Sequence, residues 1–297
     1  MQKEEFTTYH PITNIIFFLG AIILGMFLMH PVYVVISMVM SLAYLFTIKG
    51  KKAFKELAYM GILFVLMSVI NPIFNRMGVT VLFRYLGRPF TLEALIYGIA
   101  LGGMLVSILC WFACYNAVMT SDKFIYIFGK MIPSVSLILS MILRLIPNFI
   151  KKTKQISQAR QCIGMAGNAS ENKMEKLRNG ATVLSTMTSW ALEGGIITAD
   201  SMRARGYGSG KKTNFAIYYF EKRNIILICV MGLLLAGTIF TAVMGGAHAA
   251  FIPNIEMTWF GDINMFGGAI AYAFFLFLPT FLNLKEKIKW RVLRSRI

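Results

Sequence analysis

Arginine and glycine lie close together at the end of a helix-like run in the sequence TADSMRARGYG, residues 198 to 208. A guanidinium group donates two parallel hydrogen bonds to one carboxylate, so Arg203 and Arg205 have the chemistry to hold the chain against an acidic partner. Gly206 and Gly208 follow, and glycine adopts the left-handed conformation that ends a helix without steric cost. The stretch therefore predicts a helix that ends at Gly206 with arginines at its tip.

These arginines have two interpretations. A cation near the last carbonyls of a helix is favourable by a few tenths to about 1 kcal/mol, which would make both arginines part of an ordinary capped end. Alternatively the tip docks into a groove, because small residues such as Ala204 permit close approach and arginine can pair with a carboxylate. Residues two apart on a helix point about 200° away from each other, so Arg203 and Arg205 cannot share a surface while the helix persists. We expect one of them to hold the partner.

Other residue types that carry catalysis are scattered. His10, His30 and His248 lie far apart in the sequence, and no HExxH, GxSxG or Walker A motif occurs. Cys110 and Cys114 share a helix face, but no histidine or carboxylate stands nearby, which favours packing over metal binding. We expect no enzyme active site, no metal and no cofactor bound by this chain.

The composition predicts a polytopic membrane protein. Of 297 residues, 57% are hydrophobic and 14% charged, and the mean hydropathy is +0.65. This is more apolar surface than one soluble core buries. The run from 12 to 48 would be roughly 55 Å long as one helix, against a hydrocarbon core of about 30 Å, so it must turn once, at His30 and Pro31. The predicted spans are 12–29, 32–48, 57–74, 94–119, 224–246 and 266–284.

Lysine and arginine are divided unequally between the loops. Of the 30 lysine and arginine residues, 27 lie in segments 1–11, 49–56, 120–223 and 285–297. By the positive-inside rule these segments are cytoplasmic. Loops 75–93 and 247–265 are then outside, both termini are inside, and the protein is a multi-pass protein of the plasma membrane. The start MQKEEFTTYH lacks a basic region, so the first apolar run is expected to be retained. The net charge of +17 then reflects topology and anionic lipid, and no nucleic acid is expected.

The domain prediction follows from these spans: membrane helices at 1–119, a cytoplasmic helical coupling module at 120–223, and membrane helices with a basic tail at 224–297. The fold class is all-α. Within the module, the uncharged run 131–143 is too short to span, and Pro133 and Pro147 are predicted break points. A polar helix at 148–165, a break at 167–180 and a second helix at about 180–205 follow.

At this point the sequence resembles a known family. SMRARGYG is similar to the second Ala-Arg-Gly motif of the transmembrane (T) component of energy-coupling factor (ECF) transporters, the family that includes the cobalt-transport membrane subunit. Further resemblances, from about residue 9 to 284, are YHPITN at 9–14, NPIFN at 71–75, TLEALIYG at 91–98 and LRLIPNF at 143–149. The resemblance implies a non-catalytic scaffold whose coupling helices dock by tip arginines onto two ABC-type ATPase subunits. Those subunits would bind the ATP, and the membrane surface would hold a substrate-binding S component.

The first motif of this family is altered here. In QARQCIG, one register places Ala159 and Arg160 in the motif with Gln161 in place of glycine; the other aligns Gly164 and replaces the arginine by Ile163. Both registers stay open at this point. The docking residues implied by the resemblance are Arg205, Arg203, Ala204, Gly206, Arg160, Ala159 and Gly164. An altered first motif suggests unequal docking onto two non-identical ATPase subunits.

Two other function classes are alternatives to the scaffold of an ATP-driven vitamin or metal-ion importer. A secondary transporter or channel without ATPase partners needs charged or polar residues along its path, and the spans contain mainly Asn71, Asn116 and scattered Ser and Thr. An intramembrane enzyme needs converging His, Asp or Glu, and only Glu93 stands at a span entrance. The sequence does not identify the substrate, because selectivity in this family belongs to the S component.

Overall fold

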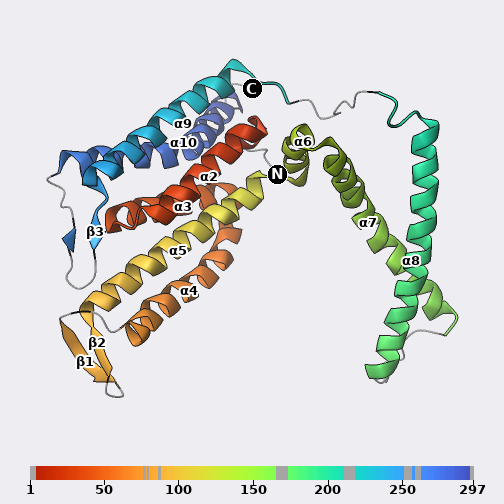
Figure 1. Cartoon of the computed structure of the whole chain (residues 1–297), viewed down its shortest axis with the longest axis horizontal. Helices are drawn as coiled ribbons and strands as arrows, with labels where there is room; N and C mark the ends of the chain where they lie inside the picture. Colours follow the sequence, from red (N-terminus) through yellow and green to blue (C-terminus); the bar gives the residue numbers. More distant parts are fainter. Residues whose placement is uncertain are drawn as a thin grey trace. The chain divides into compact units, whose positions relative to one another are not determined.

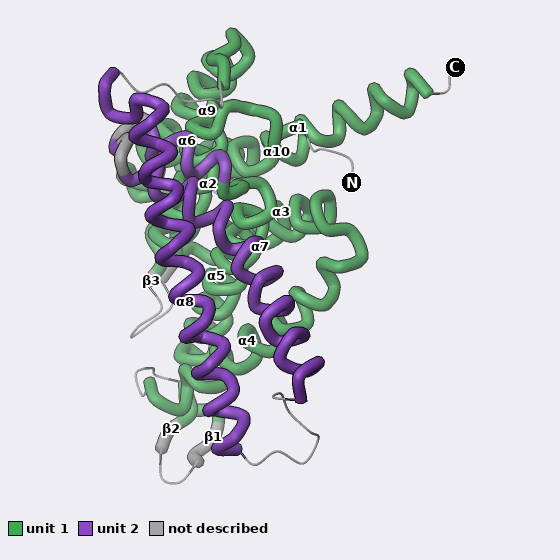
Figure 2. The backbone as a smooth tube through the Cα atoms, turned by 90° about the vertical axis from the view of Figure 1, so that its right-hand side faces the viewer, with its two compact units in different colours: residues 1–121, 218–297 green, residues 122–217 purple. Residues whose placement is uncertain are grey.

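The computed structural model describes residues 5–75, 78, 80–85, 88–164, 173–210, 218–250, 256–257 and 262–294. Most of them lie in α-helices and a few in two short antiparallel hairpins, so the predicted all-α fold is confirmed. The chain forms two compact units (Figure 1, Figure 2). Unit 1 comprises Met1–Ser121 and Tyr218–Ile297, and unit 2 comprises Asp122–Ile217.

Unit 1 is a helical bundle with a hairpin on each of two helix connections. Its helices are α1 (Glu5–Thr8), α2 (Pro11–Phe27), α3 (Pro31–Lys49), α4 (Ala53–Phe74), α5 (Leu92–Val118), α9 (Lys222–Thr241) and α10 (Ile263–Arg294). Strands β1 (Val81–Tyr85) and β2 (Arg88–Thr91) pair between α4 and α5. Strands β3 (Ala249–Ala250) and β4 (Glu256–Met257) pair between α9 and α10, where the π-helical turn η2 (Ala242–Gly246) extends α9.

Two histidine-proline pairs begin the first two apolar helices. The Nδ1 atom of His10 accepts a hydrogen bond from the Ile12 amide at 3.2 Å, and His30 does the same for Val32 at 3.4 Å. Each histidine caps a helix whose first residue is proline, which lacks an amide hydrogen and is favoured at that position. The predicted turn at His30 and Pro31 is confirmed.

Among the described residues, four helical stretches are long and apolar enough to cross a membrane: Pro31–Phe74, Leu92–Val118, Lys222–Gly246 and Ile263–Arg294. The first contains both α3 and α4, separated by the 3-10 turn η1 (Gly50–Lys52), where Gly50 has a left-handed φ of +54°. Pro11–Phe27 is apolar but has 17 residues, fewer than the roughly 20 that span a bilayer upright. Each predicted span corresponds to an apolar helix, and six crossings stay a prediction.

Helices α5 and α10 form the centre of unit 1. In their most apolar stretches 44% of the residues are buried, against 17% for Pro31–Phe74 and Lys222–Gly246. Trp111 of α5 is fully buried, and its ring centroid lies 5.6 Å from that of Phe17 and 6.2 Å from that of Tyr44. The outer helices α4 and α9 therefore present apolar side chains, such as Phe74 at 77% exposure, to the surroundings.

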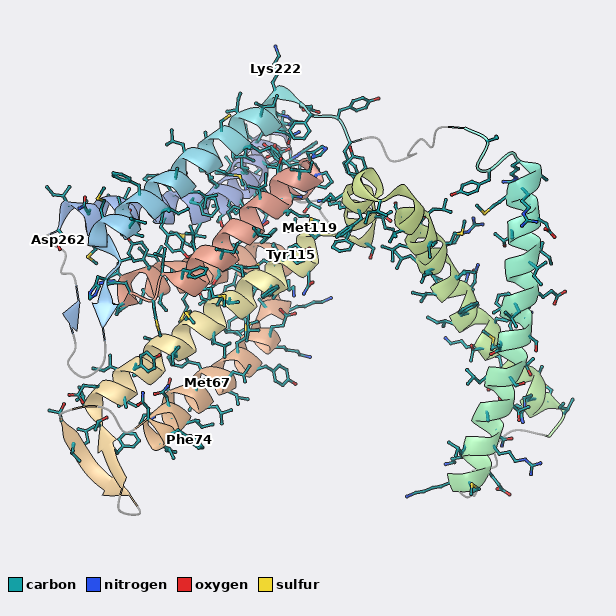
Figure 3. All side chains as sticks on the ribbon, viewed as in Figure 1. Met67, Phe74, Tyr115, Met119, Lys222 and Asp262 are labelled. Atoms are coloured by element: carbon teal, nitrogen blue, oxygen red, sulfur yellow. The ribbon has the colours of Figure 1, made fainter. Side chains whose placement is uncertain are left out.

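The two ends of unit 1 differ in what they carry. Figure 3 shows Met119 and Lys222, from which the chain leaves for unit 2 and returns, at one end, and Phe74 and Asp262 at the other. The Phe6 amide donates to Asn283 Oδ1 at 3.2 Å, which joins α1 to the late part of α10. The His10 amide donates to Asn224 Oδ1 at 3.3 Å, so the N-terminal helix lies at the same end as Lys222.

This arrangement gives a labelling prediction for the membrane topology. In a cysteine-free background, Leu82→Cys, whose site on β1 is 51% exposed, is expected to react with a membrane-impermeant maleimide added to intact cells. Lys52→Cys, on η1, is expected to react only after permeabilisation, because the positive-inside rule places 49–56 in the cytoplasm. Strong labelling of position 52 in intact cells would contradict the topology.

Arg76, one of the three basic residues assigned to the outer loops, lies outside the described residues.

Unit 2 contains α6 (Ser121–Met131), α7 (Pro133–Cys162) and α8 (Lys173–Ala204). Pro133 begins α7, as predicted, but Pro147 lies inside it, so the predicted break there is wrong. One missing amide hydrogen does not end the helix, and α7 has 30 residues in all. Helix α8 begins at Lys173, earlier than the predicted residue 180. Residues 165–172, which contain the start of the predicted break, lie outside the described residues.

Candidate functional site

Helices α7 and α8 pair side by side in unit 2 (Figure 1, Figure 2). The rings of Phe149 and Trp190 lie 5.7 Å apart with an interplanar angle of 70°, and Lys152 Nζ lies 5.6 Å from the Trp190 ring centroid. Farther along α7, Arg160 hydrogen-bonds to Asn179 of α8. Phe149 of α7 meets Trp190 of α8, and the later Arg160 meets the earlier Asn179. The two helices therefore run antiparallel.

The C-terminal tips of α7 and α8 therefore lie at opposite ends of the pair. The tip of α7 is near Asn179, while the tip of α8 follows Ala204. At a rise of 1.5 Å per residue, the two tips are on the order of 40 Å apart. A single small surface on a partner cannot contact both.

Backbone hydrogen bonds close the tip of α8. The Tyr207 amide donates to the Met202 carbonyl at 3.0 Å, and the Gly206 amide donates to the Arg203 carbonyl at 2.9 Å. These two bonds, with Gly206 at a φ of +72°, form the Schellman motif that satisfies the last carbonyls of a helix. The predicted glycine cap is confirmed, and it depends on the backbone rather than on an arginine side chain.

Arg203, Ala204, Arg205 and Gly206 are all exposed at this tip. Arg203 belongs to the last turn of α8, and Arg205 is the first residue after its last helical position. Neither side chain forms an ion pair or a hydrogen bond with another part of the chain that the structure describes. The tip thus presents two cations on a backbone whose conformation is held by its own cap.

The tip of α7 shares with the tip of α8 the left-handed glycine and one of its two capping bonds. Gly164 has a φ of +72°, equal to that of Gly206, and its amide donates to the Gln161 carbonyl at 3.0 Å. Gly164 therefore corresponds to Gly206. One residue before each glycine, Ile163 corresponds to Arg205, and two residues before it, Cys162 corresponds to Ala204. Counted from the two glycines, isoleucine stands where α8 carries the motif arginine, and the register of the family motif at this tip stays a prediction.

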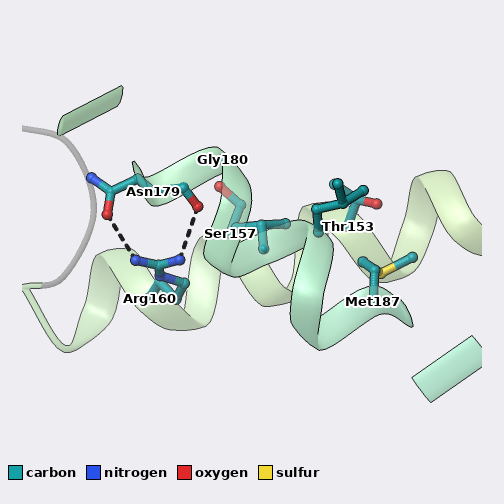
Figure 4. A pocket seen from close by; sticks show the side chains of 8 residues that line it. Thr153, Ser157, Arg160, Asn179, Gly180 and Met187 are labelled. Carbon is teal, nitrogen blue, oxygen red and sulfur yellow. Dashed lines mark hydrogen bonds between the residues drawn. The ribbon is translucent and has the colours of Figure 1, made fainter. Parts of the chain in front are cut away.

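Arg160 has a different place from Arg205. Its Nη1 donates to the Asn179 carbonyl oxygen at 3.0 Å and its Nη2 donates to Asn179 Oδ1 at 2.8 Å, as Figure 4 shows. Arg160 is half-buried, whereas Ala159 beside it is exposed. A cavity next to this contact is lined by Thr153, Ser157, Gly180, Val183, Leu184 and Met187. Arg160 therefore joins α7 to α8, and docking by Arg160 and Ala159 stays a prediction.

Two residues of this site did not stand out in the sequence. Nothing near Asn179 in the sequence suggested that its backbone oxygen and its side-chain oxygen accept hydrogen bonds from Arg160, 19 residues earlier. Ile163 could have been found from Gly164. A glycine after a helical run is the usual C-terminal cap, so the residue before it is the last one that the cap presents.

Some of the polar groups inside unit 1 join its elements. The Ser37 hydroxyl accepts hydrogen bonds from Ser107 Oγ at 2.8 Å and from Trp111 Nε1 at 3.2 Å. The Glu93 carboxylate is 6% exposed and accepts a hydrogen bond from the Thr80 amide at 3.0 Å, which ties the end of α5 to the segment before β1. Among the residues that the structure describes, no three His, Cys, Asp or Glu side chains gather as a metal site would require.

One comparison with known proteins found a family that matches this chain. A family model described as CbiQ, cobalt transport protein, matches residues 6–215, which include both helix tips. In a search of curated proteins, no sequence matches significantly.

Proposed function

Since the chain belongs to the CbiQ family of cobalt transport proteins, the family of ECF transporter T components, we propose that it is the scaffold subunit of an ATP-driven importer. It would connect two ABC-type ATPase subunits in the cytoplasm to a membrane S component that binds the micronutrient, a vitamin or a metal ion. The chain would catalyse no reaction and bind no cofactor, and ATP would act on the partner subunits. We place it in the plasma membrane with both termini in the cytoplasm.

One observation supports this proposal more than any other: the exposed Arg205 on the backbone-capped tip of α8. Because the cap holds the backbone, the tip loses little backbone freedom when a partner binds. Two parallel hydrogen bonds to a carboxylate suit such a group. The α8 tip thus has the chemistry of a docking point.

The distance between the tips supports two partners instead of one. Tips on the order of 40 Å apart along an antiparallel pair contact two separate surfaces, as two ATPase subunits would provide. When ATP binding changes the spacing of those subunits, the paired helices would transmit the movement, because contacts such as Arg160 with Asn179 join them.

A secondary transporter or channel is the alternative, and the buried groups of unit 1 favour it less. The buried carboxylate of Glu93 is engaged by the Thr80 amide, and the buried Ser37 and Ser107 hydroxyls bond to each other. A transport path needs polar groups that face an opening, whereas these groups hold elements of the bundle together.

Co-purification with ATPase activity tests the proposal. The tagged chain, extracted mildly from membranes of its own cells, is expected to bring down chains that contain a phosphate-binding loop, identified by mass spectrometry. ATP hydrolysis is expected in that complex and absent from the chain once gel filtration has removed the ATPase subunits. Turnover that persists in ATPase-free chain, or membranes that yield the chain alone under several detergents, would contradict the proposal.

A further inference from the structure

The tips of α7 and α8 match in backbone up to the terminal glycine and differ in their side chains. Both end at a glycine with a φ of +72° whose amide bonds to the carbonyl three residues earlier. At the position before the glycine, α8 carries Arg205 and α7 carries Ile163, which is 66% exposed. The same local structure therefore presents a cation at one end of the pair and a branched apolar side chain at the other.

The arginine nearest the α7 tip does not replace the missing cation. Arg160 lies three residues before Ile163, and its guanidinium bonds to the carbonyl and side-chain oxygens of Asn179. Other cations at this end, Lys173, Lys176 and Arg178, belong to the start of α8 and not to the α7 tip. Ile163 is thus the side chain that the α7 cap itself presents.

A partner surface that suits Arg205 would not suit Ile163. A carboxylate covered by isoleucine loses its water and gains no hydrogen bond in return, which is unfavourable. An apolar socket, by contrast, gains from removing the isoleucine side chain from water. Two identical partner subunits, each with one such socket, could satisfy one tip only.

We propose that the α7 tip binds one ATPase subunit through Ile163 in a socket lined by apolar side chains, and that the α8 tip binds a different ATPase chain whose socket holds a carboxylate for Arg205. The inference rests on the proposed function, which it deepens by assigning each tip its own kind of partner. The complex then contains two non-identical ATPase chains in a fixed orientation on the scaffold.

Crosslinking from equivalent positions tests which chain each tip contacts. Native Cys162 is exposed and corresponds to Ala204, so the two probes are Cys162 itself and Ala204→Cys in a Cys162→Ser, Cys229→Ser background. A short bifunctional thiol reagent in native membranes is expected to join position 162 to one ATPase chain and position 204 to the other, each identified by peptide mass spectrometry. Joining both positions to the same ATPase chain in similar amounts would overturn the inference and leave the proposed function standing.

Substitutions at Ile163 test the chemistry of the socket. Ile163→Asp is expected to reduce the amount of one co-purified ATPase chain about tenfold or more, while Ile163→Leu keeps it within about twofold of wild type. Gln158→Asp, on the exposed surface of α7 before the tip, is the matched charge control and is expected to stay near wild type. Unchanged gel-filtration profiles of the variants would exclude misfolding as the cause.

Other results of these experiments would contradict either the apolar socket or the proposed function. If Ile163→Asp and Ile163→Leu both assemble like wild type, or if Ile163→Arg binds more ATPase than wild type does, the apolar socket is wrong. If the wild-type chain brings down no ATPase at all, the proposed function fails, and the inference fails with it.

Discussion

Replacing Arg205 with alanine is expected to reduce the co-purified ATPase and the transport activity by about tenfold or more. Truncating one partner of a buried hydrogen-bonded charge pair costs about 2 to 5 kcal/mol, and about 1.4 kcal/mol corresponds to tenfold in binding. The fold should survive, because the bonds that cap α8 join the backbone of Tyr207 to Met202 and of Gly206 to Arg203. The measurement combines ATPase recovery from membranes with uptake in cells.

Lysine at position 205 separates docking from simple capping. Lys keeps the charge but lacks the planar pair of donors, so under docking Arg205→Lys should recover only part of the loss. If Arg205 served only the helix dipole, alanine would cost no more than about 1 kcal/mol of helix stability and lysine would replace it fully. Arg203→Ala, in the last turn of the same helix, is the neighbouring comparison. Wild-type assembly and uptake by Arg205→Ala would show that the α8 tip does not dock through this residue.

Replacing Gly98 with leucine is expected to destabilise unit 1 by about 1 to 3 kcal/mol or more, the usual cost of inserting a large side chain into a packed interface. Gly98 lies in α5 where it packs against α4. A Cβ atom at this position would lie 3.0 Å from the Ser68 carbonyl oxygen and 3.0 Å from the Asn71 Cβ. Because one of these neighbours is backbone, the two helices must separate to admit the side chain. Thermal unfolding of the detergent-purified chain should shift down by several degrees.

Gly61→Leu is the matched control on the facing helix α4. No atom lies within 4 Å of a Cβ built at Gly61, and leucine is the better helix former, so this variant should be as stable as wild type or slightly more so. Equal melting temperatures for Gly98→Leu and Gly61→Leu would contradict the close packing of α4 against α5.

The elements that the sequence predicted well depend on atoms close together in the chain. A histidine before a proline caps a helix within two residues, which is why the turn at His30 and Pro31 could be placed from the sequence. Gly206 ends α8 through bonds that reach back no more than five residues. Fold class followed similarly from the length and frequency of apolar runs, since a bilayer requires helices of about 20 residues.

The elements that were mispredicted depend on competition between local preference and packing. Pro147 predicted a break, but α7 continues through it, and the part of α7 that follows Pro147 packs against α8 through Phe149 and Arg160. Proline removes one hydrogen bond from a 30-residue helix, and the remaining bonds and side-chain contacts offset that loss. The early start of α8 at Lys173 brings Asn179 into the helix and within reach of Arg160.

By itself, the sequence determined that the protein is an all-α membrane protein, that its arginine-rich tip ends at Gly206, and which family it resembles, because these follow from composition, short-range capping and local motifs. Only the tertiary structure decided where the side chain of Arg160 lies. A guanidinium can face a partner or its own chain, and the sequence left both open. The antiparallel packing of α7 on α8 places Asn179 beside Arg160, so this outcome depended on a contact between helices that no local pattern encodes.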